Sequence, residues 1–183
     1  MPLPRIYLAG PDVFRPDAAE VFARLKACCA RLGLEGLAPA DGGPHAGPAP
    51  DGDALAQRIY AANIALIRSA DGLAANLMDF RGLEPDSGTV FEVGYAVALG
   101  KPVVAYGVRP GSYAERVAAA LPCAHDGAGV LRETASGLMV EGLGQRLNLM
   151  LSRSAGLADT AEAALQQLAA RLGAAAAPYN PAA

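Results

Sequence analysis

Short apolar runs alternate with longer amphipathic stretches along most of this chain, and this alternation constrains the fold more than any other feature. We expect strands at residues 5–9, 34–37, 72–78 and 102–106, and helices at about 16–32, 53–69, 87–100, 114–121 and 159–172. Alternating strands and helices are typical of a parallel sheet, because each connection must cross over the sheet. The sequence therefore predicts a doubly wound α/β fold with helices on both faces of the sheet.

The length suits a single domain. The chain has 183 residues, of which 52% are apolar, and a formal charge of -3. We expect one domain over residues 1–183, with a core at about 4–172 and a frayed tail at 173–183. Residues 38–53 form a loop without periodicity, which we interpret as either a mobile lid or an insertion over a site.

Charge and targeting signals argue against several functional classes. Fifteen Lys and Arg residues are scattered along the chain and outnumbered by eighteen acids, so no basic face for nucleic acid is expected. The first residues lack the basic start and long apolar run of a signal peptide, and no later segment reads as a membrane span. We expect a cytoplasmic protein that binds neither nucleic acid nor membrane.

The cysteines and histidines do not predict a metal site or a disulfide framework. Cys28 and Cys29 are adjacent and Cys123 is far away, so we interpret all three as core thiols. His45 lies in a Gly/Pro loop and His125 near Cys123, and the two histidines are isolated from one another, which argues against zinc. We expect no metal and no cofactor.

Glu92 stands alone as an acid within the apolar, small-residue pattern of residues 87–100. At helical spacing its neighbours are Gly88, Thr89, Tyr95, Ala96 and Leu99, which do not form a solvated charged stripe. A carboxylate removed from water needs a partner or a chemical role. The alternative is an ordinary surface glutamate at the edge of the helix.

Polar residues follow the expected strands at residues 10–17, at 79–88 and after 106. Ligands of open parallel sheets bind outside these carboxyl ends. Asp86 and Ser87 form a plausible helix cap, and the helix dipole would help to keep Glu92 ionised. An ionised carboxylate close to a sugar can act as a nucleophile and form a covalent glycosyl intermediate, as in retaining glycosidases.

Four segments carry a resemblance to the nucleoside 2-deoxyribosyltransferase family: residues 6–14, 63–76, 85–103 and 147–150. The block from Asp86 to Glu92 is the most specific of them. The resemblance implies a flavodoxin-like sheet and transfer of 2-deoxyribose between nucleobases, with Glu92 as nucleophile. It further implies that Tyr7 orients this carboxylate and that Asp86 holds the sugar hydroxyls. Asn148 of a neighbouring subunit would assist Asp86 at the 5′ end of the sugar, so a homo-oligomer, either dimer or hexamer, is expected.

The remaining candidate substrate-binding residues have structural alternatives. Phe14 could stack on a nucleobase or be a core aromatic, and Met150 could line the base pocket or fill core. Asp12, like Asp17, could be a helix cap beside a proline. The full set of candidate binding residues is Gly10, Asp12, Phe14, Asn63, Ser87, Gly88, Asn148 and Met150.

Asn63 departs from the family pattern, because many relatives have there an aspartate that contacts the base. An amide cannot supply a proton at neutral pH, so a water would protonate the leaving base or hydrogen bonding alone would activate it.

Asp71 is not expected to replace this acid. It precedes the strand at 72–78, at the end far from the site, and we interpret it as a turn or cap acid. Purine or pyrimidine preference stays open.

Three alternatives to the transferase remain open. A nucleoside 5′-monophosphate N-glycosidase would share the fold and the nucleophile, and Arg15 or Arg81 could favour its phosphate, whereas Asp86 would repel it. The pattern from Gly88 to Glu92 partly resembles that of cytokinin-activating phosphoribohydrolases, but their Pro-Gly-Gly run is absent here. A non-catalytic nucleotide-sensing module would use the same architecture without needing Glu92.

Overall fold

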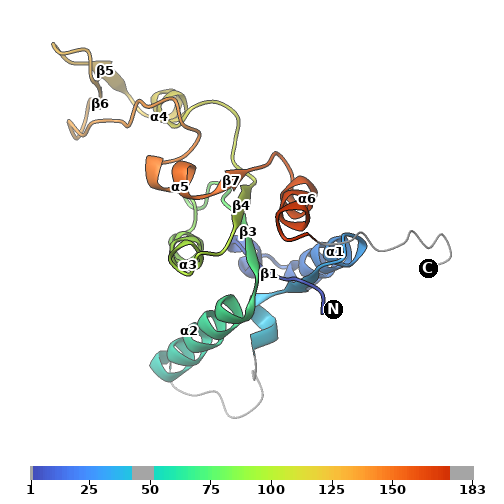
Figure 1. Cartoon of the computed structure of the whole chain (residues 1–183). Helices are drawn as coiled ribbons and strands as arrows, with labels where there is room; N and C mark the ends of the chain where they lie inside the picture. Colours follow the sequence, from blue (N-terminus) through green and yellow to red (C-terminus); the bar gives the residue numbers. More distant parts are fainter. Residues whose placement is uncertain (1, 43–51, 174–183) are drawn as a thin grey trace.

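The computed structural model describes residues 2–42 and 52–173, and in this part of the chain five parallel strands form the central sheet (Figure 1). Their spatial order is β2-β1-β3-β4-β7, the doubly wound order in which the sheet grows outward from β1 in both directions. The strands are β1 (Arg5–Ala9), β2 (Glu35–Leu37), β3 (Gly72–Asn76), β4 (Val103–Tyr106) and β7 (Gly156–Leu157). The predicted flavodoxin-like α/β fold is confirmed.

Helices cover both faces of this sheet. On one face lie α1 (Ala18–Arg31) and α6 (Ala161–Arg171), and on the other lie α2 (Gly52–Ser69), α3 (Ser87–Ala98) and α5 (Leu149–Ser154). Two short 3-10 helices, η1 (Pro11–Phe14) and η2 (Pro39–Gly42), follow β1 and β2, and α4 (Tyr113–Ala120) follows β4.

Alternation along β1 explains how one strand serves two cores. Ile6 and Leu8 point to the core under α1 and α6, whereas Tyr7 and Ala9 point to the core under α2 and α3. All four side chains are at most 2% exposed, because both faces of a central parallel strand are covered. Tyr7 therefore faces α3, the helix that carries Glu92.

The elements expected from periodicity are present, with ends shifted by a few residues. The segment 122–158 was not predicted, and the structure forms there the antiparallel hairpin β5 (Cys123–His125) and β6 (Leu131–Glu133), then α5 and β7. Strands of two or three residues are too short to show a period, which is why the pattern did not indicate them. The expected lid or insertion lies mostly at 43–51, and most of the expected frayed tail at 174–183, both outside the described residues.

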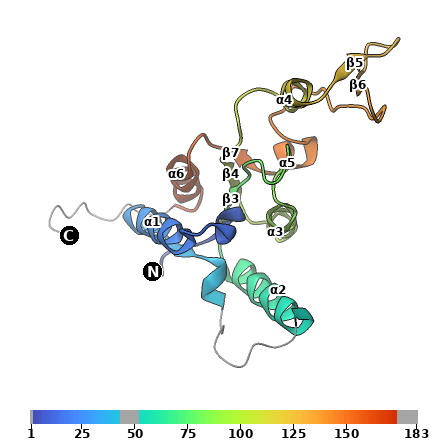
Figure 2. The same cartoon turned by 180° about the vertical axis from the view of Figure 1, so that it is seen from behind.

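The β5–β6 hairpin lies far from the central sheet, and Figures 1 and 2 show it at the outer end of the molecule beyond α4. Several large apolar side chains from the end of this hairpin through the first turn of α5 are exposed: Leu138, Met139, Leu143 and Met150. Within the described residues, no helix combines the length and the hydropathy required to cross a membrane.

The order of the strands creates a crevice between β1 and β3. The chain leaves β1 toward β2 on one side, whereas β3 continues to β4 on the other, so the loops after β1 and β3 diverge. Such a switch point is where open α/β sheets bind ligands. Gly10 follows β1 here, and Asn76 ends β3.

Candidate active site

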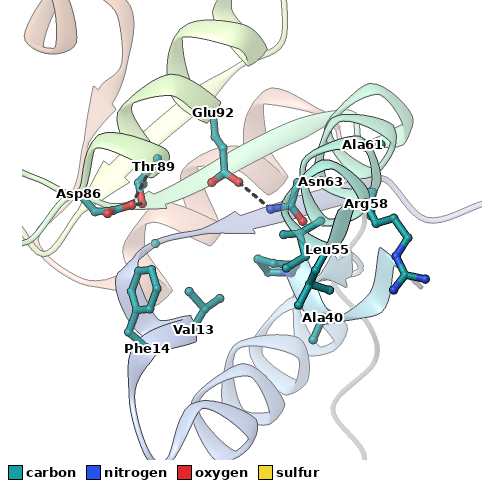
Figure 3. Close-up of a pocket in the computed structure, with 15 residues that line it drawn as sticks. Val13, Phe14, Ala40, Leu55, Arg58, Ala61, Asn63, Asp86, Thr89 and Glu92 are labelled. Carbon is teal, nitrogen blue, oxygen red and sulfur yellow. Dashed lines mark hydrogen bonds between the residues drawn. The ribbon is translucent and has the colours of Figure 1, made fainter. Parts of the chain in front are cut away.

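A cavity of about 740 Å³ lies at the switch point, between the loop after β1, the helix α2 and the start of α3 (Figure 3). A volume of this size is typical of pockets for small organic ligands. Its walls are formed by Gly10, Val13, Phe14, Pro39, Ala40, Leu55, Arg58, Ile59, Ala61, Ala62, Asn63, Asp86, Gly88, Thr89 and Glu92.

Glu92 and Tyr7 form the centre of this site. The Tyr7 hydroxyl donates a hydrogen bond of 2.7 Å to Oε1 of Glu92, across 85 residues of sequence. Tyr7 is fully buried, so burial and the adjacent carboxylate hold its pKa well above the ordinary range, and the phenol stays a donor. The carboxylate is therefore fixed by a neutral group and directed into the cavity.

Burial raises the pKa of Glu92 to about 7. Desolvation is the main cause, the hydrogen bond from Tyr7 opposes it, and the negative charge of Asp86 adds to the rise. The helix dipole was expected to keep this group ionised, but the burial outweighs it, because α3 begins at Ser87 and the dipole acts mainly within the first turn.

Asn63 lies beside Glu92 and donates a longer hydrogen bond of 3.4 Å from Nδ2 to the same oxygen, Oε1 (Figure 3). The other Glu92 oxygen, Oε2, has no hydrogen-bond donor among the described residues. Asn63 Oδ1 is buried and likewise lacks a partner in that part of the chain.

Asp86 is the N-cap of α3, as the sequence predicted. Its Oδ2 accepts hydrogen bonds of 2.9 Å from the backbone N–H and from the hydroxyl of Thr89, which is 2% exposed. Asp86 also lines the cavity, so one carboxylate both caps the helix and faces the pocket. Gly88, one turn before Glu92, lines the cavity too.

The segment after β1 supplies the opposite wall. Gly10 passes so close to β3 that an added Cβ would lie 2.7 Å from Cβ of Asn76, so no larger residue fits. Phe14 is 62% exposed and lines the cavity, with its ring stacked on Phe80 at 5.4 Å. It is therefore not a core aromatic. The Arg81 guanidinium lies over Phe80, 4.7 Å from the ring centre.

Four predicted binding residues do not line this cavity. Asp12 is buried and bonded to Asn76, and Ser87 is exposed at the first position of α3. Asn148 caps α5 by accepting from Met150 N–H and donates to Glu141, and Met150 is 71% exposed. A single chain therefore does not bring the last two residues to Glu92.

Other charged residues have structural partners. Arg15 forms two hydrogen bonds with Asp17, which occupies the N-cap position of α1 without a side-chain cap bond. Asp71 accepts from the N–H of Arg5 at the start of β1, in agreement with the turn role expected for it. Neither Arg15 nor Arg81 lines the cavity.

Sequence reasoning missed the wall that α2 contributes. Leu55, Ile59 and Ala62 recur at helical spacing and lead to Asn63, a signal that could have indicated a pocket-facing stripe. Arg58 also lines the cavity, but it lies outside this apolar stripe, so the sequence pattern did not indicate it. Figure 3 shows it on the opposite side of Glu92 from Asp86.

These features define a flavodoxin-like α/β protein with a cavity at the switch point of its sheet, into which the half-buried carboxylate of Glu92 faces. The chain belongs to the nucleoside 2-deoxyribosyltransferase family, which it matches over residues 6–150. The resemblance found in the sequence is thus confirmed.

Three individual proteins illustrate the similarity. A solved structure described as a 2-desoxiribosyltransferase from Leishmania mexicana is 32% identical, with a TM-score of 0.72 over 91% of this chain and 97% of that one. A conserved protein from Enterococcus faecalis V583 shares the fold at 21% identity, with a TM-score of 0.57 over 92% of this chain and 99% of that one. The uncharacterized protein C191.05c of Schizosaccharomyces pombe is 36% identical over 116 residues, which are 63% of this chain and 55% of that protein. The chain thus spans about half the length of this curated relative.

Proposed function

We propose that this protein transfers 2-deoxyribose between nucleobases through a covalent intermediate on Glu92. The observation that carries the proposal is the Glu92 carboxylate, held by Tyr7 at 2.7 Å and facing a cavity large enough for a nucleoside. The family membership and the similarity to the Leishmania mexicana structure support the same reaction.

In the proposed first step, a Glu92 oxygen attacks the anomeric carbon of the bound deoxynucleoside. The new C–O bond forms as the C–N bond to the base breaks, and the base leaves with the electron pair of that bond. Both hydrogen bonds to Glu92 end on Oε1, so Oε2 is the oxygen free to attack. In the second step a nitrogen of the incoming base displaces Glu92, and water in its place gives slow hydrolysis.

The leaving base needs a proton that Asn63 cannot supply. Its amide can only donate or accept hydrogen bonds, and in this structure Nδ2 is directed to Glu92. We propose that water delivers the proton, while Asn63 helps to position the base and the nucleophile.

Asp86 favours a nucleoside with a free 5′ hydroxyl over a 5′-monophosphate. A phosphate dianion at ~5 Å from this carboxylate, in an effective dielectric of ~20, would be repelled by several kcal/mol before screening. Among the described lining residues the one cation is Arg58, which lies across the cavity from Asp86 (Figure 3). The nucleoside 5′-monophosphate N-glycosidase is therefore the less favoured alternative.

The direct test supplies 2′-deoxyinosine with free adenine and measures deoxyadenosine by chromatography. Glu92→Ala should reduce transfer and hydrolysis by several orders of magnitude. Glu20→Gln, which changes an exposed glutamate on α1, is the matched control and should leave both rates unchanged. Intact mass after brief exposure to substrate should show a deoxyribosyl adduct that is absent from Glu92→Ala.

The same assay separates the transferase from the alternatives. Release of deoxyribose at the same rate with and without adenine would identify a hydrolase. Binding of nucleotide without turnover would identify a sensing module and end the enzymatic proposal.

A further inference from the structure

Asn76 is a buried polar residue at the carboxyl end of β3 that the proposed chemistry does not use. It is 7% exposed and lies between the segments that leave β1 and β4. An added Cβ at Gly10 would lie 2.7 Å from its Cβ, and one at Gly107 would collide with its Oδ1. Glycines on both sides thus let two loops approach the same amide.

The orientation of this amide is fixed by bonds on both of its atoms. Oδ1 accepts from the N–H of Met78 at 3.3 Å, so Nδ2 is directed toward the loop after β1. There Nδ2 donates a 2.8 Å hydrogen bond to Oδ2 of Asp12, across 64 residues of sequence. A hydrogen bond from a neutral donor to a buried carboxylate is stronger than one between neutral groups.

Asp12 lies between two residues that do face the ligand cavity. Gly10 precedes it and Val13 follows it, and with Phe14 they form the wall opposite Glu92. Asp12 itself is 7% exposed and does not line the cavity. Its carboxylate is therefore placed to hold the η1 segment on the sheet.

We propose that Asn76 is a positioning residue that fixes the η1 wall of the nucleobase pocket through its hydrogen bond to Asp12. This inference rests on the proposed function, because it assigns the wall to the base. Glu92, Tyr7 and Asn63 are supplied by α3, β1 and α2, so a displaced η1 should weaken base binding without disabling the nucleophile.

The test is an exchange of the two side chains. Asn76→Asp places two carboxylates face to face and removes the donor, whereas Asp12→Asn keeps an acceptor for Asn76. In the double variant Asp12→Asn with Asn76→Asp the donor and acceptor trade places. Asp17→Asn, on a half-buried acid five residues further along the chain, is the matched control.

Base exchange should separate the variants by KM and not by kcat. Asn76→Asp and Asn76→Ala should raise the KM for free adenine about tenfold, with kcat within about twofold. Asp17→Asn should stay close to wild type, whereas Asp12→Asn, which keeps a weaker neutral hydrogen bond to Asn76, should raise this KM by less than Asn76→Ala does. The double variant should recover most of what Asn76→Asp loses. A loss in Asp12→Asn as large as that in Asn76→Ala would mean that the Asp12 charge itself is required, and would overturn the proposal.

A measurement without substrate keeps the test independent of the proposed reaction. Amide hydrogen exchange over residues 10–18 should be faster in Asn76→Asp and return toward wild type in the double variant, because the Arg15 N–H is bonded to the Asp12 carbonyl within this segment. Unchanged exchange in Asn76→Asp would overturn the proposal. A wild-type protein that fails to exchange bases while these exchange rates respond as expected would refute the proposed function and leave the positioning role intact.

Discussion

In the proposed mechanism Glu92 must be ionised to attack the sugar, yet its surroundings favour the protonated form. Because its pKa is raised to about 7, about one molecule in a hundred carries the charge at pH 5. We expect kcat/KM for 2′-deoxyinosine to rise tenfold per pH unit up to about 7 and then to level off. A profile over pH 5–9 measures this, and a half-maximum near 4.5 would contradict it. Tyr7→Phe removes the hydrogen bond that lowers this pKa and should move the acid limb to higher pH.

The same raised pKa predicts a cost in stability. A carboxyl group that binds its proton more tightly in the folded chain than in the unfolded chain destabilises the fold as pH rises from about 4.5 to about 7. Glu92→Gln removes this titration, so it should increase the free energy of unfolding at pH 8 by an amount of the order of 2 kcal/mol, and by much less at pH 4. Denaturant titrations at both pH values measure the effect. An equal gain at both would show that packing and not ionisation is responsible.

The residue at position 63 should influence the pKa of Glu92, because it lies beside the Glu92 carboxylate. In Asn63→Asp a second carboxylate would replace the amide whose Nδ2 lies 3.4 Å from Glu92 Oε1. Like charges at this distance raise the pKa of one of them, so the acid limb of the pH profile should move upward relative to wild type. Asn63→Ser, which is neutral, is the control for lost contacts. A downward shift in Asn63→Asp would contradict this account.

At the scale of elements, α3 carries both the N-cap residue Asp86 and the proposed nucleophile Glu92. Asp86 closes the first turn by accepting two hydrogen bonds from Thr89, and Glu92 follows six residues later on the same helix. A change at Asp86 therefore affects both the helix end and the pocket, and the two effects need different substitutions to separate them.

Asp86→Ser and Asp86→Ala make this separation. Serine can cap a helix, so Asp86→Ser should keep most of the stability, whereas Asp86→Ala should lose about 1 kcal/mol. Binding of a 5′-phosphate should depend on the charge at position 86 and not on the helix cap, because the Asp86 carboxylate repels the phosphate. Asp86→Ser should therefore improve the use of 2′-deoxyinosine 5′-monophosphate relative to 2′-deoxyinosine. Thermal unfolding and steady-state kinetics with the two substrates measure these effects, and no gain with the monophosphate would remove the electrostatic explanation.

At the scale of the whole molecule, the predicted roles of Asn148 and Met150 require a second subunit. Both residues are exposed and lie outside the cavity of their own chain, and the segment that precedes them in the chain also exposes Leu138, Met139 and Leu143. Apolar surface of this kind is often covered by a partner. Asn148 of one subunit reaching the site of another therefore stays a prediction.

Mixing the variants Glu92→Ala and Asn148→Ala tests this prediction. If a site takes Glu92 from one subunit and Asn148 from the other, a randomly mixed dimer of the two variants should regain about a quarter of the wild-type sites. Refolded mixtures assayed for base exchange measure this, with sedimentation to give the number of subunits. If each chain completes its own site, the mixture will show no activity beyond the sum of its parts.

The sequence alone determined the order of the main strands and helices. Apolar residues recur about every two positions in a strand and about every three and a half in a helix, and this spacing is visible in consecutive residues. It also indicated the cap at Asp86 and the exceptional position of Glu92, since a lone acid within an apolar helix pattern is visible without coordinates. The hairpin after α4 and the strand β7 left no such signal, because their few residues become strands only by pairing.

Tertiary structure decided what these residues contact. The alternation of β1 turns Tyr7 toward α3 and brings its hydroxyl within 2.7 Å of Glu92. The burial of Glu92 in the folded chain raises the pKa of its carboxyl group above the value that the helix dipole alone would favour. The same folding buries Asp12 against Asn76 and leaves Phe14 exposed on the pocket wall. Hydrogen bonds and desolvation depend on distances between segments far apart in the chain, which local sequence patterns do not encode.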